Sequence, residues 1–546
     1  MKNHNQTKKL NLGCGKDYKQ GFVNVDIRAD VGADLVHDVT KPFPLRENSV
    51  SEVIAQDVFE HLTKEQQSSL FRELFRLLSK SGTLHVRIPN NEDIWERFSN
   101  DPDTRNLFLF GDTSESGIWG SHKSGHTPSS FAELAAISGF RLLKYSAVDT
   151  NYEFEYIKDS LPRLKGVVFI NQTLGMGGAE NFNTQLLSWL KRNKVPVKAW
   201  STHVTFNKYL TSQGISAGKI PFVVDVIGDW KGLIKGILLF PAASVYYAYL
   251  TFKNRKSGTI VMSGFIEKIL VTPWAKLLNI PVVWIDFGPW QTIFSKFFGL
   301  PRVLYRAVSK LPDFVIEPSE NTRIKNLNIT GISTAKTKII PCGINPLKSV
   351  PSTPKKLTAY CVSRMELGKG QDLLIKAWRK VVTRFPSAHL YLIGEGDFRR
   401  ELEQLVRKMD LTGSVTFLGR VDNLAKEISS ISLGIFPSVW PLEGFGLVLL
   451  EAMSMRKPVV SFDAGPYPEI LNSDCSIVVD KGNIDELSKA ILRIFSEPKL
   501  ARRLGGNGKK RFNKYFTINK IAPQYGTILL EAQILCQIRK TFPNIY

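Results

Sequence analysis

Short apolar runs alternate with segments of helical periodicity along most of this 546-residue chain. The runs at residues 9–13, 22–27 and 166–170, for example, have the length of strands. Alternation of this kind is typical of βαβ units, in which helices cover a parallel sheet. The sequence therefore predicts an α/β protein, and its length predicts about three domains.

Turn residues divide the chain. A first unit is expected over residues 1–158, with further strands at 34–39, 51–55, 82–88, 142–147 and 152–157. New strands at residues 166 and 357 suggest a second unit over 164–347 and a third over 348–515. Residues 516–546 are expected to be largely helical. No Gly/Ser-rich tether separates the first two units, so we expect them to touch.

Charge is distributed unevenly. Residues 1–160 hold 19 Lys and Arg against 23 Asp and Glu, a net charge of −4, whereas the remainder carries +26. A basic surface of this size suits anionic lipid, phosphate-bearing substrates or no specific partner at all. The sequence contains no nucleic-acid-binding motif, so we expect no nucleic acid partner.

Two further features bear on location. The five cysteines are scattered without a C-x-x-C pair, and the first residues lack the apolar stretch of a secretory signal. Both features predict a cytoplasmic protein. The apolar stretch 236–252 has 17 residues and contains Pro241. It is at the lower length limit for a membrane span, so we expect a buried or interfacial helix.

The run at residues 441–454 carries the main chemical signal. Glu443 and Glu451 are eight residues apart and bracket a Gly-x-Gly turn that ends at Gly446 and opens an apolar helix. Glycines let backbone amides approach a diphosphate, and a helix N-terminus favours its negative charge. The alternative is a loop–helix junction with solvated glutamates.

Two other runs support a diphosphate site. Arg364 and Lys369 follow the strand predicted at 357–362 and could neutralise phosphate charge. Gly177 and Gly178 follow the strand at 166–170 and open a helix. The alternative for the first run is two solvated cations on a loop, and the alternative for the second is an ordinary helix cap.

Together these motifs resemble the family 4 type of retaining GT-B glycosyltransferases over about residues 165–510. The resemblance implies two Rossmann-like halves facing a cleft, with the C-terminal helix crossing back to the acceptor half. It implies that Glu443 holds donor hydroxyls and Glu451 the ribose. Arg364, Lys369, Gly446, Gly177 and Gly178 would bind the donor, a nucleotide-sugar, without a metal.

One position departs from that family. The family often carries a His after a strand of the first half, where this chain has Asp286. We assign Asp286 a catalytic role at a sugar hydroxyl. Capping of the following turn is the alternative.

The first unit opens with a different motif. Gly13 and Gly15 form a Gly-x-Gly turn after the first strand, and Asp26 ends the second. An acid at the end of the second strand typically binds ribose hydroxyls. Asp38 ends the third strand, where it could meet an adenine amine. Only about eight residues separate the glycine loop from the second strand, too few for a full helix.

This ordered set resembles the Rossmann-like class I methyltransferases that use S-adenosylmethionine. The resemblance implies that Gly13, Gly15, Asp26 and Asp38 bind this cofactor. Methylation of a sugar hydroxyl needs a base. The candidates are His61, His122 and His126, and their spacing in the sequence does not favour one over the others.

The sequence thus predicts a bifunctional enzyme of surface-polysaccharide or glycan biosynthesis, in which a methyltransferase precedes a GT-B hexosyltransferase. Its partners would be a nucleotide-sugar donor and a glycan or lipid-linked acceptor. Peripheral contact with the anionic inner face of a membrane is expected. Two alternatives stay open: an inactive methyltransferase-like docking unit, or a non-catalytic nucleotide-sugar or glycan-binding scaffold.

Overall fold

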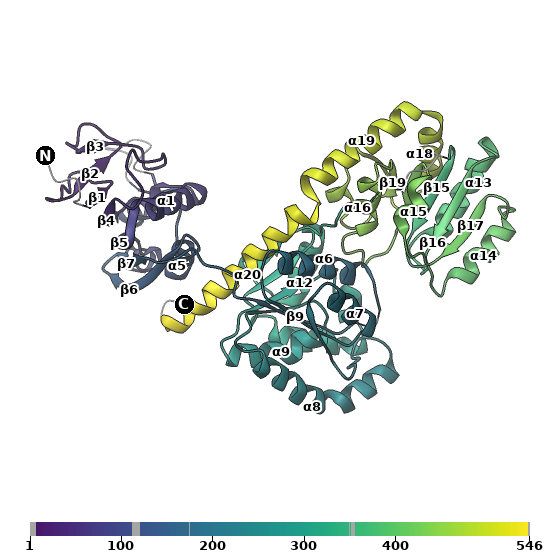
Figure 1. Ribbon diagram of the computed structural model, residues 1–546, viewed down its shortest axis with the longest axis horizontal. Coiled ribbons are helices and arrows are strands. Elements are labelled where there is room, and N and C mark those ends of the chain that lie inside the picture. Colours follow the sequence, from purple (N-terminus) through teal and green to yellow (C-terminus); the bar gives the residue numbers. More distant parts are fainter. Residues whose placement is uncertain (1–6, 112–120, 174, 349, 351–354, 544–546) are drawn as a thin grey trace. The chain divides into compact units, whose positions relative to one another are not determined.

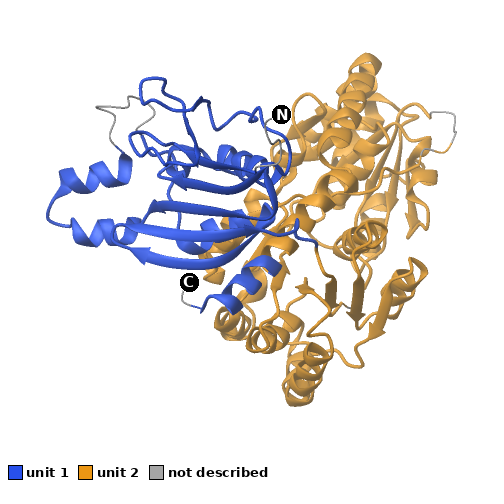
Figure 2. Cartoon of the chain, turned by 60° about the vertical axis from the view of Figure 1, so that its left-hand side comes forward, with its two compact units in different colours: residues 1–163, 533–546 blue, residues 164–532 orange. Residues whose placement is uncertain are grey.

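The computed structural model describes residues 7–111, 121–173, 175–348, 350 and 355–543. These residues form two compact units (Figure 2). Unit 1 comprises residues 1–163 and 533–546, and unit 2 comprises residues 164–532. Three sheets account for the strands, one in unit 1 and two in unit 2 (Figure 1).

Unit 1 is built on a seven-stranded sheet of order β3-β2-β1-β4-β5-β7-β6. Its strands are β1 (Lys8–Leu12), β2 (Val23–Asp26), β3 (Leu35–Val36), β4 (Val50–Gln56), β5 (Leu78–Pro89), β6 (Phe140–Val148) and β7 (Asn151–Lys158). β7 pairs antiparallel with both β5 and β6, and the other pairings described in this sheet are parallel. All seven strands predicted from the sequence are present.

Among the described residues up to 163, the helices begin only after β4. They are η1 (Phe59–His61), α1 (Lys64–Leu77), α2 (Asn91–Arg97), α3 (Pro102–Phe110) and α5 (Pro128–Ile137). Residues 13–22 contain no helix, as the short spacing between the first two strands predicted. The glycine loop therefore connects β1 directly to β2 across the strand ends.

The first half of unit 2 has a parallel sheet of order β10-β9-β8-β11-β12-β13-β14. Its strands are β8 (Val167–Asn171), β9 (Val197–Ser201), β10 (Ser216–Lys219), β11 (Thr259–Met262), β12 (Val282–Ile285), β13 (Phe314–Glu317) and β14 (Thr337–Ile339). Its helices are α6 (Gly178–Arg192), α7 (Val204–Ser212), α8 (Trp230–Lys253), α9 (Ile266–Leu277), α10 (Gln291–Phe294), η3 (Phe297–Gly299), α11 (Leu300–Val308), α12 (Glu320–Thr330) and η4 (Thr334–Lys336). Trp284, Tyr247 and Tyr305 fill its core.

The second half has a parallel sheet of order β17-β16-β15-β18-β19-β20. Its strands are β15 (Thr358–Val362), β16 (His389–Ile393), β17 (Val415–Gly419), β18 (Leu433–Phe436), β19 (Val459–Phe462) and β20 (Ser476–Val479). Its helices are α13 (Gln371–Arg384), α14 (Arg399–Lys408), α15 (Leu424–Ser429), α16 (Leu447–Ser454), α17 (Tyr467–Ile470), α18 (Ile484–Ser496) and α19 (Pro498–Tyr515). Strand order reverses between β15 and β18, a position where α/β sheets commonly bind ligands.

The last helix, α20 (Ile518–Thr541), contacts the first half of unit 2. Tyr525 is buried and donates its hydroxyl to the carbonyl of Ile340 at 3.2 Å. Thr259 donates to the carbonyl of Leu529 at 3.2 Å. The boundary between the two units falls inside α20, after Ala532.

Helix α8 is longer than the segment expected at 236–252. Its buried side packs Tyr247 and Leu250 into the core of the first half. Its other side exposes large apolar residues: Trp230, Ile234, Ile237, Leu238, Val245, Tyr249 and Phe252. Among the described residues it is the one helix long and apolar enough to cross a membrane. Its burial pattern is that of a helix lying on a domain surface.

Candidate functional site

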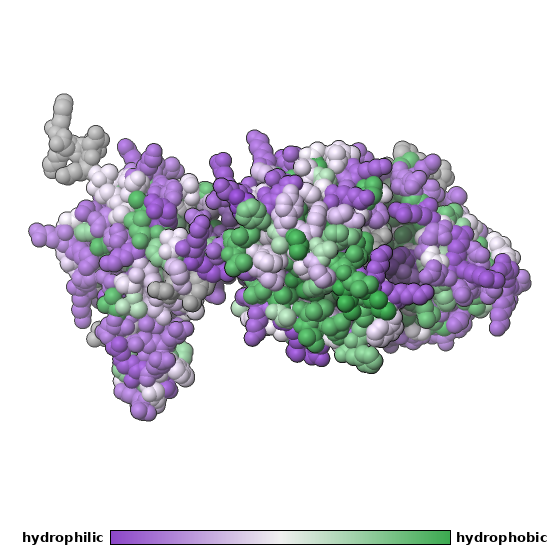
Figure 3. Space-filling model, turned by 90° about the horizontal axis from the view of Figure 1, so that it is seen from below, coloured by the Kyte–Doolittle hydropathy of each residue, from purple (hydrophilic) through white to green (hydrophobic). Residues whose placement is uncertain are grey.

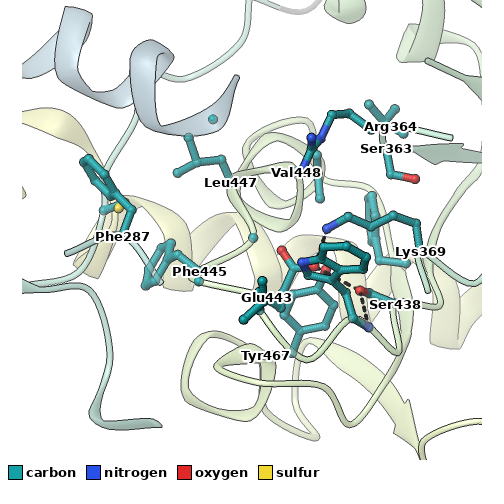
Figure 4. A pocket seen from close by; sticks show the side chains of 18 of the residues that line it. Phe287, Ser363, Arg364, Lys369, Ser438, Glu443, Phe445, Leu447, Val448 and Tyr467 are labelled. Atoms are coloured by element: carbon teal, nitrogen blue, oxygen red, sulfur yellow. Dashed lines mark hydrogen bonds and ion pairs between the residues drawn. The ribbon is translucent and has the colours of Figure 1, made fainter. Parts of the chain in front are cut away.

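Unit 2 contains a cavity of about 300 Å³ at the reversal point of its second sheet. The ends of β15 and β18 line it, together with the first residues of α6 and α16. Figure 4 shows its side chains. Because parallel strands direct their carboxyl ends to one edge, loops far apart in sequence meet here.

Two helices begin at this cavity. Gly446 precedes α16 with φ of 96°, and a Cβ there would lie 2.6 Å from the Tyr467 ring. Gly178 begins α6, and a Cβ there would lie 3.7 Å from Leu447, the first residue of α16. The N-termini of both helices therefore border the same space. Unpaired amides at such ends favour an anion.

Charged groups supply the cavity's chemistry. Lys369 Nζ lies 2.9 Å from Glu443 Oε2, and both side chains are largely buried. Ser438 Oγ donates to the same carboxylate oxygen at 2.9 Å. The Arg364 side chain is 68% exposed and pairs with Glu366 at 2.7 Å. The structure thus brings together Glu443, Lys369, Arg364, Gly446 and Gly178.

Glu451 lies within α16 and is not among the lining residues. It follows Leu447 and Val448, which do line the cavity, by four and three residues. Side chains at those spacings share a helix face. Burial raises the pKa of Glu451 to about 7.

Two other predicted residues lie away from the cavity lining. The Gly177 amide donates to Glu180 Oε2 at 3.0 Å and caps α6. Asp286 is fully buried in an ion pair with Lys268 and accepts the Tyr305 hydroxyl at 2.7 Å. With both carboxylate oxygens occupied in the core, Asp286 does not fit the role at a sugar hydroxyl predicted for it.

The sequence did not single out three lining residues. Ser438 orients Glu443, and Trp440 places its ring 5.4 Å from Lys369 Nζ. Burial and the nearby Glu443 hold the pKa of the Tyr467 hydroxyl well above its usual value. Ser438 and Trp440 belong to no recognisable motif, whereas Tyr467 lies in the run 463–469, which resembles a loop of the same glycosyltransferase family.

Unit 1 has its own cavity, of about 610 Å³, at the ends of β1, β2 and β4. Gly13, Asp26 and Asp38 line it, but Gly15 does not. Asp26 accepts the backbone amide of Gly15 at 2.8 Å and that of Arg28 at 2.9 Å. Burial acts to raise the pKa of Asp38, but hydrogen bonds from Thr40 hold it below its ordinary value.

The structure distinguishes the three candidate histidines by their position relative to this cavity. His61 and His122 line this cavity, and burial lowers the pKa of each. His126 lies outside its lining and is engaged at both ring nitrogens, by Gln67 at 2.8 Å and by Ser130 at 3.3 Å. Burial lowers the pKa of His126 to about 4. His126 therefore fits a packing role.

Family models match both units. Residues 347–511 match glycosyl transferases group 1, and residues 10–86 match a methyltransferase domain. The chain therefore carries a glycosyl transferases group 1 domain behind an N-terminal methyltransferase domain. This confirms the architecture that the motifs indicated.

Curated relatives match parts of the chain. One is the GDP-mannose-dependent monoacylated alpha-(1-6)-phosphatidylinositol monomannoside mannosyltransferase of Corynebacterium glutamicum, 27% identical over 31% of this chain and 50% of that protein. Another is the N-acetyl-alpha-D-glucosaminyl L-malate synthase of Bacillus anthracis, 29% identical over 32% of this chain and 46% of that protein. The chain spans about half the length of the curated relatives it matches.

Solved structures establish the fold of unit 2. The Anabaena protein HepE in complex with UDP has a TM-score of 0.58 at 20% identity, covering 67% of this chain and 99% of that chain. The predicted fold class, a Rossmann-like methyltransferase domain followed by a GT-B fold, is confirmed.

Proposed function

We propose that unit 2 is a retaining glycosyltransferase that takes a sugar from a nucleoside-diphosphate donor. Residues 164–347 would form the acceptor half and 348–515 the donor half, with 516–546 packing back on the acceptor half. The observation that carries the proposal is the Lys369–Glu443 pair at 2.9 Å, in a cavity bordered by two helix N-termini. The relatives support a hexosyl donor, because their names include GDP-mannose and N-acetylglucosaminyl transfer.

Each group has a distinct task in this reaction. Lys369, Arg364 and the α16 N-terminus meet the charge that develops on the departing diphosphate. Glu443, oriented by Ser438, accepts a hydrogen bond from a donor hydroxyl, and Glu451 accepts one from the ribose. As the anomeric C–O bond breaks, the acceptor oxygen bonds to the same face of that carbon. Its proton passes to a diphosphate oxygen, so no separate base is required.

Replacement of the paired residues tests the donor site. Glu443→Gln should lower sugar transfer roughly 10- to 100-fold, because a hydrogen bond to a charged group contributes about 1.5–3 kcal/mol. Lys369→Ala should weaken binding of UDP or GDP by a similar factor, measured by calorimetry. Lys380→Ala, which removes an exposed lysine of α13 paired with Asp485, is the matched control. Transfer at the wild-type rate by both site variants would contradict this donor site, whereas absence of transfer by the wild type with every donor would favour the scaffold alternative.

We further propose that unit 1 binds S-adenosylmethionine and methylates the glycan. The cavity fits this cofactor, because Gly13 has φ of 61° and a Cβ there would meet Val58 at 2.6 Å. Asp26 is held by backbone amides and can still accept ribose hydroxyls, while Asp38 borders the same space. The cofactor would supply an electrophilic methyl group. The chain's residues would orient it and receive the sugar.

Calorimetry on the full chain tests this second activity. S-adenosylmethionine should bind at one site per chain, and Asp26→Ala should weaken binding at least ~10-fold through loss of charge-assisted hydrogen bonds. Asp159→Ala, at an exposed aspartate paired with Arg141, is the control. Absence of heat at millimolar cofactor would favour the inactive docking unit.

Finally, we propose that unit 2 rests on an anionic membrane surface, on the cytoplasmic side, where a lipid-linked acceptor would lie. Figure 3 shows a broad apolar patch on the face that α8 occupies. Exposed basic residues flank the exposed apolar side of this helix: Lys231, Lys235, Lys253, Arg255 and Lys256. The phosphatidylinositol acceptor in the name of the Corynebacterium relative supports a lipid partner.

A further inference from the structure

Three side chains converge in the cavity of unit 1. Glu60, His61 and His122 each place one potential ligand atom within 4.8 Å of the other two. All three line the cavity that contains Gly13 and Asp26. Glu60 and His61 belong to η1, whereas His122 comes from the segment before α5.

The hydrogen bonds of the histidines define their free nitrogens. His61 Nδ1 lies 3.1 Å from the carbonyl of Ser121, and His122 Nδ1 lies 3.1 Å from the carbonyl of Leu109. A carbonyl can only accept, so each Nδ1 carries the proton of the neutral ring. Each Nε2 is left with a lone pair. Histidines that bind metals are oriented by this kind of bond.

Glu60 provides an independent observation. Only 3% of its surface is exposed, and within the described residues its Oε2 has no hydrogen-bond partner. A buried carboxylate oxygen without a partner is costly. Asp57 is paired with Arg87, and a carboxylate has no hydrogen to donate to Oε2. A cation would satisfy Oε2.

The backbone holds the cluster in place without any ion. The amides of Lys123 and Ser124 donate to the carbonyl of Glu60 at 2.7 and 3.1 Å. Gln67 Nε2 donates to the carbonyl of Phe59 at 2.6 Å and to Ser124 Oγ at 2.6 Å. The segment that carries His122 is therefore tied to η1, and the three ligands are positioned in advance.

We propose that Glu60, His61 and His122 bind a divalent transition-metal ion in the cavity of unit 1. Two imidazoles and a carboxylate suit zinc, manganese, iron or cobalt, and three protein ligands leave coordination positions open. Because all three side chains line the cavity, hydroxyl groups of a sugar acceptor bound there would be able to complete the coordination. The hydroxyl ligand rests on the proposed methyl transfer, but the metal site does not. The site departs from the expectation that the protein needs no metal.

Cobalt titration of the 546-residue chain tests the site. After treatment with a chelator and dialysis, Co²⁺ should bind at one ion per chain and develop visible d–d absorption. Zn²⁺ should displace it, with metal content checked by mass spectrometry. Glu60→Gln and His122→Ala should each weaken Co²⁺ binding at least ~10-fold. His85→Ala, at a histidine on β5 outside the cavity, should bind as the wild type does.

Three results would overturn the proposal: no Co²⁺ bound by the wild type, equal binding by all variants, or equal loss in His85→Ala. Glu60→Gln retains the shape of the side chain, and circular dichroism verifies that each variant is folded. Binding of S-adenosylmethionine is measured separately. A variant that loses Co²⁺ binding but still binds S-adenosylmethionine supports the metal site. A wild type that binds Co²⁺ but not S-adenosylmethionine refutes only the proposed methyl transfer.

Discussion

Two lysine–carboxylate pairs in unit 2 have the same chemistry and differ in whether a ligand can reach them. Lys369 and Glu443 keep 12% and 13% of their side-chain surface exposed and line the cavity. Lys268 and Asp286 keep none. A phosphate oxygen can replace a carboxylate at an accessible ammonium group. This difference in access supports the proposed donor-binding role of the first pair and a structural role for the second.

Removal of Asp286 should reveal its structural role. Asp286→Ala leaves Lys268 buried without a counter-charge, which typically costs about 3–5 kcal/mol. We expect a lower midpoint of thermal unfolding, with donor affinity of the folded protein unchanged. The double variant Lys268→Met/Asp286→Leu should recover much of the loss, since no charge stays unpaired. Wild-type stability together with abolished transfer in Asp286→Ala would instead restore the catalytic assignment.

At the scale of elements, the site is made by strand ends and helix starts. Lys369 follows β15, and Gly446 sets the left-handed turn from which α16 begins. Gly444 allows a close approach between the halves, because a Cβ there would lie 1.6 Å from the carbonyl oxygen of Phe287. The cavity therefore depends on small residues as much as on charged ones.

Local patterns were sufficient to predict most of these elements. The strands of unit 1 are short apolar runs beside turn residues, and the glycines and cations after β15 and before α16 follow recognisable spacings. Tertiary contacts were not predictable in this way. Asp286 could not be assigned to Lys268 and Tyr305 from sequence, and nothing in the spacing brings His122 to His61.

Gly444→Ala should separate the two halves at the cavity. The added methyl group cannot occupy the position of the Phe287 carbonyl, so the loops must move apart. Overpacking of this kind typically costs about 1–3 kcal/mol. We expect a lower unfolding midpoint and a higher KM for the donor. Gly413→Ala is the control, because a Cβ there meets nothing within 4 Å. Equal behaviour of the two variants would contradict the close approach.

At the scale of the whole molecule, charge is distributed unevenly along the chain, and unit 2 carries a cluster of exposed apolar residues on α8. Residues 1–160 carry a net charge of −4 and the rest +26. The three most exposed of the large apolar residues of unit 2 lie on or near α8. Leu238 and Val245 are 76% and 72% exposed, and Phe298 is 99% exposed. A soluble acceptor would not require such a surface, whereas a lipid headgroup region matches both its charge and its apolar character.

Binding to vesicles should therefore depend on both properties. The 546-residue chain should co-sediment with vesicles containing anionic lipid, less with neutral ones, and should be released by half-molar salt. Each basic residue near the surface contributes roughly 1 kcal/mol, screened over a Debye length.

The pair Lys231→Glu and Lys235→Glu should weaken vesicle binding on the order of 10-fold or more. Leu238→Ser should also weaken vesicle binding, without loss of stability, since that side chain is exposed. The pair Lys376→Glu and Lys380→Glu, on α13 of the other half, controls for the same change in net charge. Equal partitioning onto neutral and anionic vesicles would exclude the electrostatic contribution, and absence of sedimentation would point to a soluble acceptor.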